Sequence, residues 1–445
     1  MSKYKDTIYA LSTPSGKSAI AVIRISGDDS LKILKKISPI KKIISNKTKL
    51  VFLKFKKKLI DQVLITYFKN PKSFTGEDMV EISCHGSIAI ISKISEILSS
   101  LGLRLADPGE FTRRSLINNK TDLLKVEGLS DLINAETEKQ RSLAISGFTG
   151  RTSKFVNQIN TKLNLIIANI EALIDFSDED LPQNLLNKIK EQNKNIIKTI
   201  KEEIDRSKVS KPIREGFVVS VVGKPNTGKS SFVNFISKKE VSIVTNIPGT
   251  TTDSVTSVID IMGYKFTFID TAGIRKHKNK IEEIGIKKTT DVISKSDLNL
   301  VFLEKKEINK YKNIKNKIFI RSKLDKRKSK IQEKNITNIS SVTGDGIKGL
   351  LKKIEKKLVI SKKNEPIFSR ERHLNIMKNV FLELKSIKTE DSLDIKAFKF
   401  REALRLSLEI NQKFDIEDIL DIIFKDFCIG KWFHVKTFKK YSVVV

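Results

Sequence analysis

The residues best suited to chemistry in this chain are two glycines, a lysine and a serine at fixed spacing. Gly223, Gly228, Lys229 and Ser230 follow the apolar run FVVSVV and open an apolar helical pattern, which is the context that a P-loop requires. Glycines let backbone N–H groups converge on phosphate oxygens, the lysine reaches the β and γ phosphates, and the serine hydroxyl ligates Mg²⁺. The segment predicts a nucleoside triphosphate site, with further contacts from Asn226, Thr227 and Ser231.

Two segments downstream carry residues that suit Mg²⁺ and the γ-phosphate. Thr251, in the segment GTTTD, can complete the Mg²⁺ shell while sensing the γ-phosphate, and Thr250 precedes it. Asp270 ends the apolar run KFTFI, so its carboxylate can hold Mg²⁺ through water. The N–H of Gly273 can then meet the γ-phosphate. The nucleotide contacts predicted from this second segment are Asp270, Thr271, Ala272 and Gly273.

A third segment predicts that the base is guanine. Ser322, Lys323 and Asp325 follow the apolar run KIFI at the position where GTPases carry Asn-Lys-x-Asp. The aspartate accepts two N–H bonds from guanine and the lysine stem covers the ring. Serine replaces the asparagine here, so base choice rests mainly on Asp325. Ser340 and Ser341 belong to a later loop that closes over the base. Together the motifs predict a GTPase domain.

The residue after the second segment constrains how GTP could be hydrolysed. Ile274 stands where Ras-like enzymes place a water-orienting glutamine. An isoleucine cannot orient water, so hydrolysis needs another polar group and another positive charge in the transition state. Arg275 is adjacent, but a surface charge on the loop explains it equally well.

The composition narrows the class of protein. Lysine and arginine number 84 and aspartate and glutamate 52 in 445 residues, which gives a formal net charge of +32. Charge alone leaves nucleic-acid binding and a dispersed lysine-rich surface as open alternatives. Two cysteines exclude a disulfide scaffold. No run of about 18 apolar residues is present, so we expect a cytoplasmic protein without a membrane partner.

Hydrophobic periodicity predicts a multidomain α+β chain of roughly three domains. Residues 1–118 contain strand-like runs at Ile20–Ile25, Val51–Phe55 and Val63–Phe68, and a helical pattern at Ile88–Leu101. Residues 119–212 form the first part of a helical domain. Residues 213–362 alternate strands, glycine loops and helices, which indicates an inserted α/β P-loop GTPase domain. Residues 363–431 return to helices as the second part of one bundle, and 432–445 are a carboxy-terminal extension.

Apolar spacing predicts which faces of the bundle helices are buried. One long helix carries its face at spacings of three and four, namely Phe155, Ile159, Leu163, Ile166, Ile170 and Leu173. A second helix follows Pro182 with the face Leu185, Ile189, Ile197, Ile200 and Ile204. A third, after the GTPase domain, has the face Leu374, Met377, Phe381, Leu384 and Ile387.

With these motifs in place, the chain resembles the tRNA-modification GTPase MnmE family over residues 1 to about 431. Outside the GTPase domain, the resemblance is carried by the segments TPSGKSAIAVIRISG, SFTGEDMVEISCHG, DPGEFTRRSLINNK and FCIGK. Each short match is weak, but their order around an inserted GTPase domain is specific. A ribosome-assembly GTPase without modification chemistry is the alternative, and it would share the nucleotide motifs but not these outer segments.

The resemblance implies how hydrolysis is achieved. In this family a K⁺ ion beside the phosphates supplies the positive charge that an arginine supplies elsewhere. The matching K⁺ ligands here are Asn226, Thr245, Ile247 and Thr250, and the Mg²⁺ ligands are Ser230 and Thr251. The water-positioning carboxylate matches Glu282, with Glu283 beside it; an exposed helix charge is the alternative for Glu282.

The resemblance also implies a folate-binding-like, dimerising amino-terminal domain. Its folate contacts match Arg24, Glu81 and Lys120, and a carboxy-terminal lysine matches Lys431. The alternatives are an edge-strand charge for Arg24 and helix-surface charges for Glu81 and Lys120. The implied ligand is 5,10-methylenetetrahydrofolate or 5-formyltetrahydrofolate. The implied reaction adds a carboxymethylaminomethyl group to C5 of the wobble uridine of tRNA. The implied assembly is a homodimer that forms a heterotetramer with the FAD-dependent protein MnmG.

Three departures from the family pattern bear on these expectations. Thr252 replaces an arginine in the segment after the P-loop, and Ser322 replaces the asparagine near the base. The chain also continues past Lys431 with an aromatic and basic segment, Trp432–Val445. That segment either contacts RNA or packs as an ordinary terminus. The pair Cys84 and His85 is better explained by a structural role than by metal binding, because adjacent residues seldom point at one ion.

Overall fold

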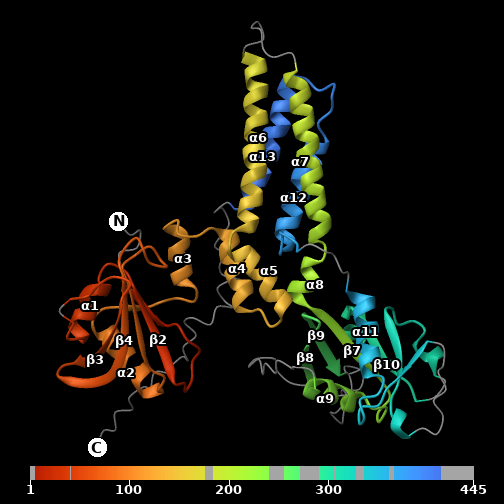
Figure 1. Cartoon of the computed structure of the whole chain (residues 1–445), viewed down its shortest axis with the longest axis horizontal. Coiled ribbons are helices and arrows are strands. Elements are labelled where there is room, and N and C mark those ends of the chain that lie inside the picture. Colours follow the sequence, from red (N-terminus) through yellow and green to blue (C-terminus); the bar gives the residue numbers. More distant parts are fainter. Residues whose placement is uncertain are drawn as a thin grey trace, which may run out of the picture. The chain divides into compact units, whose positions relative to one another are not determined.

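The computed structural model describes residues 6–40, 42–175, 184–239, 255–270, 290–304, 307–326, 335–359 and 365–411. It divides the chain into two compact units, one formed by Met1–Ser130 with Asn411–Val445 and the other by Asp131–Ile410. Figure 1 shows the elements of each unit. The predicted α+β domain, helical bundle and P-loop α/β domain are all present, so the predicted fold class is confirmed.

The first unit is built on a six-stranded mixed sheet in the order β3-β4-β5-β2-β1-β6. Its strands are β1 (Ile8–Leu11), β2 (Ile20–Ser26), β3 (Thr48–Phe55), β4 (Lys58–Phe68), β5 (Met79–His85) and β6 (Arg104–Leu105). Alternating side chains of the strands point into one core, which they share with α1 (Ser30–Ile37) and α2 (Ile88–Ser100). The predicted strands and helix of this region are confirmed.

The helix α3 (Glu110–Ile117) carries a strongly charged motif of the first unit, and α4 (Leu123–Ile133) continues from the first unit into the second, which begins at Asp131. The helix α3 begins directly after Gly109. Six of the eight residues of α3 are buried, including Glu110 and Arg114. Burial of charged groups at this density requires ion pairs among them.

Four long helices of the second unit form a bundle, in which α6, α7, α12 and α13 run side by side (Figure 1). Their bounds are Arg151–Asp175, Leu185–Ser207, Glu371–Lys385 and Leu393–Glu409. The buried face of α6 matches the predicted one except for Leu173, which is half-buried. On α7 the prediction was wrong at Ile197, because Ile196 is the buried residue there, and Leu185 is half-buried.

The buried face of α12 also differs from the predicted one. It consists of His373, Met377, Val380 and Leu384, so Leu374 and Phe381 lie beside the core and Ile387 lies beyond the helix. The prediction used the spacing of apolar residues only and so omitted the buried His373. Parts of the predicted face are therefore shifted by one residue. Two shorter helices flank the bundle segment: α5 (Glu138–Phe148) precedes α6, and α8 (Ser210–Glu215) connects α7 to the second sheet.

The GTPase domain has a six-stranded sheet in the order β12-β11-β10-β7-β9-β8. Its strands are β7 (Phe217–Gly223), β8 (Val255–Ile261), β9 (Tyr264–Asp270), β10 (Leu298–Phe302), β11 (Lys317–Arg321) and β12 (Ile336–Asn338). Among the strands of this sheet that the structure describes, only the β8–β9 pair is antiparallel. The helices α9 (Lys229–Lys239) and α11 (Ile347–Leu358) contribute apolar side chains to the core. The parallel strands direct their carboxyl ends to one edge, where ligands of such sheets bind.

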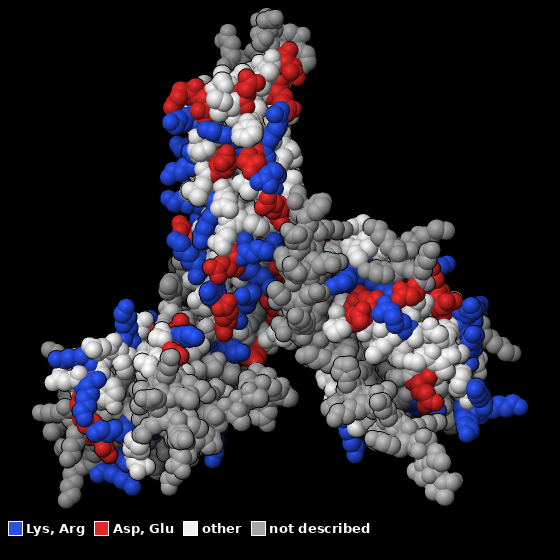
Figure 2. Space-filling model, turned by 180° about the vertical axis from the view of Figure 1, so that it is seen from behind, with Lys and Arg blue, Asp and Glu red and all other residues white. Residues whose placement is uncertain are grey.

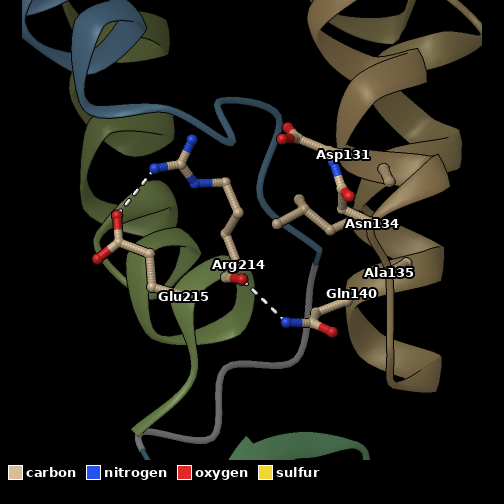
Figure 3. Close-up of a pocket in the computed structure, with 8 residues that line it drawn as sticks. Asp131, Asn134, Ala135, Gln140, Arg214 and Glu215 are labelled. Carbon is tan, nitrogen blue, oxygen red and sulfur yellow. Dashed lines mark hydrogen bonds and ion pairs between the residues drawn. The ribbon is translucent and has the colours of Figure 1, made fainter. Parts of the chain in front are cut away.

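A small cavity lies in the second unit where α4 and α5 approach α8. It has a volume of about 180 Å³, and Figure 3 shows its polar lining. The lining residues include Asp131, Asn134, Gln140, Arg214 and Glu215. The side-chain amide of Gln140 donates to the carbonyl of Arg214 at 2.9 Å, so α5 is tied to the segment that leads into β7. Within the ranges that the structure describes, no helix is long and apolar enough to span a membrane.

Candidate functional site

The P-loop connects β7 to α9, as its sequence predicts. Gly223 and Gly228 both have positive φ, and each is forced to be glycine by a close neighbour. A Cβ on Gly223 would lie 2.5 Å from the carbonyl oxygen of Phe302, and one on Gly228 would lie 2.6 Å from Ser322 Oγ. Asn226 also has a left-handed backbone, with φ near 60°, which asparagine tolerates better than most residues. The loop is therefore compact.

Lys229 is held within the P-loop by backbone oxygens. Its ammonium donates to the carbonyls of Gly223 at 2.9 Å and Lys224 at 2.6 Å, and the side chain is almost fully buried. Thr227 Oγ1 donates to the Lys224 carbonyl as well, at 2.8 Å. These bonds keep a full positive charge at the start of α9, where the helix dipole also favours an anion.

Ser230 and Asp270 meet although they are far apart in sequence. The hydroxyl of Ser230 donates to Oδ2 of Asp270 at 2.7 Å. Asp270 ends β9, which pairs with β7, so the sheet register brings its carboxylate to the P-loop. A hydroxyl and a carboxylate are the hard oxygen ligands that Mg²⁺ prefers, and these two residues fit the predicted magnesium site.

The predicted base-binding residues gather at the ends of β11 and β12. Ser322 Oγ donates to the carbonyl of Thr227, and Lys323 Nζ donates to the carbonyl of Asn226 at 2.8 Å. Both bonds tie the segment after β11 to the P-loop. The aliphatic stem of Lys323 therefore lies between the P-loop and the segment after β11. From this position it can cover the ring of a bound guanine.

Asp325 is oriented by the next loop. The hydroxyl of Ser340 donates to Oδ1 of Asp325 at 2.6 Å, and this bond lowers the pKa of the Asp325 carboxyl. Ser340 Oγ in turn accepts from the N–H groups of Val342 and Thr343. The carboxylate is thus ionised and exposed, as an acceptor of guanine N–H groups must be. The neighbouring Ser341 hydroxyl is buried and has no hydrogen-bond partner among the described residues.

One contact of the P-loop could not be predicted from any sequence motif. Lys224 pairs with Glu307, which lies after β10, at 2.6 Å. The hydrogen bond to Glu307 raises the pKa of Lys224, and the same bond lowers the pKa of Glu307. Several predicted site residues lie outside the described ranges, namely Thr245, Ile247, Thr250, Thr251, Thr271, Ala272, Gly273, Glu282 and Lys431.

In the first unit, Arg24 and Glu81 face each other on neighbouring strands. They are register partners on β2 and β5, and Arg24 donates to Glu81 Oε1 through Nε at 3.0 Å and Nη2 at 2.6 Å. The guanidinium also lies over the rings of Phe74 and Phe111, at 5.3 and 5.6 Å from their centroids. Strand β2 is internal to the sheet and Glu81 lies on a strand, so the edge-strand and helix-surface alternatives are wrong for these two residues.

Lys120 lies near the same loop. It is exposed, and its stem approaches Gly76 so closely that a Cβ there would lie 3.0 Å from Lys120 Cγ. Phe74 and Gly76 belong to one loop, which Arg24 touches through Phe74. The structure therefore gathers Arg24, Glu81 and Lys120 around that loop. An arginine, a carboxylate and two aromatic rings suit a flat heteroaromatic ligand with an acidic tail.

A buried cluster of charged residues, which the sequence motifs do not predict, lies beneath this loop. Arg114 is fully buried and contacts Glu77 at 3.2 Å, Glu110 at 2.9 Å and Asp6 at 2.8 Å. Ser26 Oγ donates to Glu77 Oε2 at 2.8 Å. The segments RISG, FTGED and PGEFTRR, which are distant in sequence, thus meet through Ser26, Glu77, Glu110 and Arg114. The motifs alone do not predict a role for these charged residues. The one signal in the sequence is that charged residues recur within otherwise apolar segments.

The pair Cys84 and His85 has the structural role that was favoured. Burial, with the nearby Asp61 carboxylate, raises the pKa of the Cys84 thiol to about 11, which makes it a poor nucleophile. His85 Nδ1 lies 2.8 Å from Asp61 Oδ1, and its backbone N–H donates to Asp61 Oδ2 at 2.9 Å. His85 therefore joins β5 to β4.

Comparison with known proteins decides the family. Residues 123–428 match the model of the MnmE helical domain, and residues 7–120 match that of the GTP-binding protein TrmE N-terminus. The chain belongs to the MnmE family. It is 36% identical to a tRNA modification GTPase MnmE of Rickettsia bellii (strain RML369-C), with 96% of this chain and 100% of the relative covered. Relatives of the same name from Pelagibacter ubique and Fervidobacterium nodosum are 38% and 37% identical, each over 96% of this chain and 100% and 98% of the relatives.

Proposed function

We propose that this MnmE family member hydrolyses GTP with Mg²⁺ and K⁺ and couples hydrolysis to tRNA modification. The modification is addition of a carboxymethylaminomethyl group to C5 of the wobble uridine, with a methylene folate as one-carbon donor. The observation that carries the GTPase part is the convergence of Ser230, Asp270 and Lys229 at one edge of the sheet. The tRNA part is supported by the name of the relatives, tRNA modification GTPase.

Each nucleotide part has its own residues. Lys229 and the P-loop N–H groups hold the phosphates, and Ser230, Thr251 and Asp270 hold Mg²⁺. Asp325, set by Ser340, accepts the guanine N–H groups. This arrangement favours guanine because adenine presents no matching pair of donors to the carboxylate.

Hydrolysis requires a positioned water and a positive charge beside the phosphates. Glu282 orients the water, since Ile274 cannot. Asn226, Thr245, Ile247 and Thr250 hold K⁺, which supplies the positive charge in the transition state. The exposed Asn226 side chain at the tip of the P-loop supports this assignment.

The first unit holds the folate. Glu81 meets the N–H groups of the pterin, while Arg24, Lys120 and Lys431 serve its carboxylates and ring system. The aromatic rings of Phe74 and Phe111 next to Arg24 support this assignment. The working assembly is a homodimer that forms a heterotetramer with the FAD-dependent MnmG protein and acts on tRNA in the cytoplasm.

The deciding experiment measures the wobble nucleoside of tRNA in a strain that lacks this protein. Expression of the wild-type chain should restore the modified uridine. Expression of the Lys229→Ala variant should not, because the positive charge that binds the phosphates is lost. A purified wild-type chain should also turn over GTP faster in KCl than in NaCl. Normal modification in the deletion strain would refute the tRNA part, and equal rates in both salts would refute the K⁺ part.

A further inference from the structure

Helix α7 carries a stripe of lysines on its outer face, which we define as Lys190, Lys194, Lys198 and Lys201. All four are exposed. At about 100° per residue they fall within an arc of about 80°, spaced over roughly 16 Å of the helix. The buried residues of α7, such as Ile189, Ile196 and Ile200, lie on the other side of the helix. Packing of the bundle therefore leaves the whole α7 stripe facing solvent.

The lysines of the α7 stripe are not engaged by acidic side chains among the described residues. None of its lysines forms an ion pair with any residue in the described part of the chain, and Glu191 and Glu202 lie along one margin of the arc. Some bases elsewhere on the bundle are paired, as in Lys208 with Asp205 at 2.7 Å and Arg401 with Glu171 at 2.7 Å. Figure 2 shows basic side chains in a column along one edge of the bundle.

We propose that the α7 stripe binds the sugar–phosphate backbone of RNA, and this inference rests on the proposed action on tRNA. The partner must carry regularly spaced negative charge, because four lysines one turn apart present a line of positive charge. Lysine ammonium groups are mobile point charges that suit phosphate oxygens without fixed geometry. The stripe is long enough to reach several phosphates of one strand.

The composition of the stripe disfavours a protein partner. Protein interfaces are enriched in arginine and aromatic residues and depleted in lysine. Between Lys190 and Lys201 the exposed side chains of α7 are all charged or polar, so no apolar anchor is available. An interaction that depends on lysine charge alone is sequence-independent, so the α7 stripe positions RNA and leaves recognition of the uridine to other residues.

The test uses the full-length chain with the triple substitution Lys194→Gln, Lys198→Gln and Lys201→Gln. The matched control is Lys348→Gln, Lys352→Gln and Lys356→Gln on α11, which removes the same charge from exposed lysines at helical spacing. The probe is an unmodified tRNA transcript, whose Kd is measured across a series of KCl concentrations. All substituted side chains are exposed, so thermal unfolding and GTP turnover should match the wild type.

The α7 variant should bind tRNA roughly tenfold or more weakly at low salt. Its slope of log affinity against log salt should be shallower by about 2–3, since each lost phosphate contact removes about 0.7–0.9. The slope of the α11 control should differ from the wild-type slope by less than the value of one phosphate contact, about 0.7–0.9. Replacing the same three α7 lysines by arginine should preserve binding, because the charge is retained.

Four results would overturn the proposal. An α7 variant with wild-type affinity and slope refutes the stripe and leaves the proposed function standing. An equal loss in the α11 control shows that only net charge matters. Loss of binding to the FAD-dependent partner with tRNA binding intact assigns the stripe to a protein. If the wild-type chain binds no tRNA at any salt, both this inference and direct tRNA binding under the proposed function fail together.

Discussion

The hydroxyl of Ser322 donates a hydrogen bond of 2.5 Å to the carbonyl oxygen of Thr227. This single contact joins the base-binding segment after β11 to the P-loop, and both residues are buried. It accounts for the tolerance of serine at a position where GTPases carry asparagine, because the shorter side chain still reaches the P-loop backbone. The close approach of Ser322 to Gly228 has the same origin.

We expect Ser322→Ala to weaken GTP binding by roughly two- to tenfold. The substitution removes one neutral hydrogen bond, which contributes about 0.5–1.5 kcal/mol. Ser322→Asn should instead tighten GTP by up to about tenfold, because the amide offers both a donor and an acceptor. Titration with a fluorescent GTP analogue measures both variants. Unchanged affinity in the alanine variant and weaker binding in the asparagine variant would contradict this account.

The K⁺ dependence of turnover is expected to require the Asn226 side chain. Asn226→Gly is the suitable variant, because the backbone there has φ near 60° and an alanine would add strain. Wild-type turnover should be much faster in KCl than in NaCl at equal ionic strength, and the glycine variant should show equal, slow rates. A glycine variant that keeps the K⁺ stimulation would remove Asn226 from the proposed ligand set.

Substitution of Glu282 should separate catalysis from binding. Glu282→Ala is expected to lower kcat at least about tenfold while leaving GTP affinity nearly unchanged, since a water-orienting carboxylate acts mainly in the transition state. Steady-state turnover and equilibrium titration measure the two quantities. Glu283→Ala is the neighbouring control, and a larger loss there would move the assignment by one residue.

Arg114 should be among the residues most important for stability of the first unit. Arg114→Met leaves Glu77 and Glu110 buried without their shared cation, and breaking a buried pair costs about 3–5 kcal/mol. The free energy of unfolding of the Arg114→Met variant, measured by urea titration, should therefore be about 3–5 kcal/mol lower than that of the wild type. Arg401→Met is the control, because its pair with Glu171 is exposed and should contribute less than about 1 kcal/mol. A small effect at Arg114 would mean that the cluster is not needed for folding.

The same cluster predicts a loss of stability in acid. Burial alone would raise the pKa of Glu110, but hydrogen bonds from Arg104, the Asp107 N–H and Arg114 outweigh it, so the pKa of Glu110 is lowered. A lowered folded-state pKa contributes stability above the unfolded value, about 4.3, and this contribution disappears as the pH falls toward the folded value. Stability should be flat near neutrality and decline below about pH 4. Glu110→Gln should remove part of this pH dependence.

The nucleotide motifs could be predicted from sequence because their chemistry is local. Spacing from Gly223 to Ser230 fixes a strand, a loop and a helix start within one short segment, and the structure has that order. Long periodic helices such as α6 were predictable for the same reason, since the 3.6-residue repeat is written in consecutive residues. The outer motifs identified the family, but not what their residues touch.

Tertiary structure decided the contacts between distant segments. Sheet register places Glu81 opposite Arg24 and Asp270 beside Val221. The P-loop that follows β7 then brings Ser230, on α9, to the Asp270 carboxylate. Burial of Arg114 among Glu77, Glu110 and Asp6 required three segments to fold onto one another. The sequence by itself determined the residue types and their local order; the folded chain decided which charges share a low-dielectric interior and which, as on α7, are left to solvent.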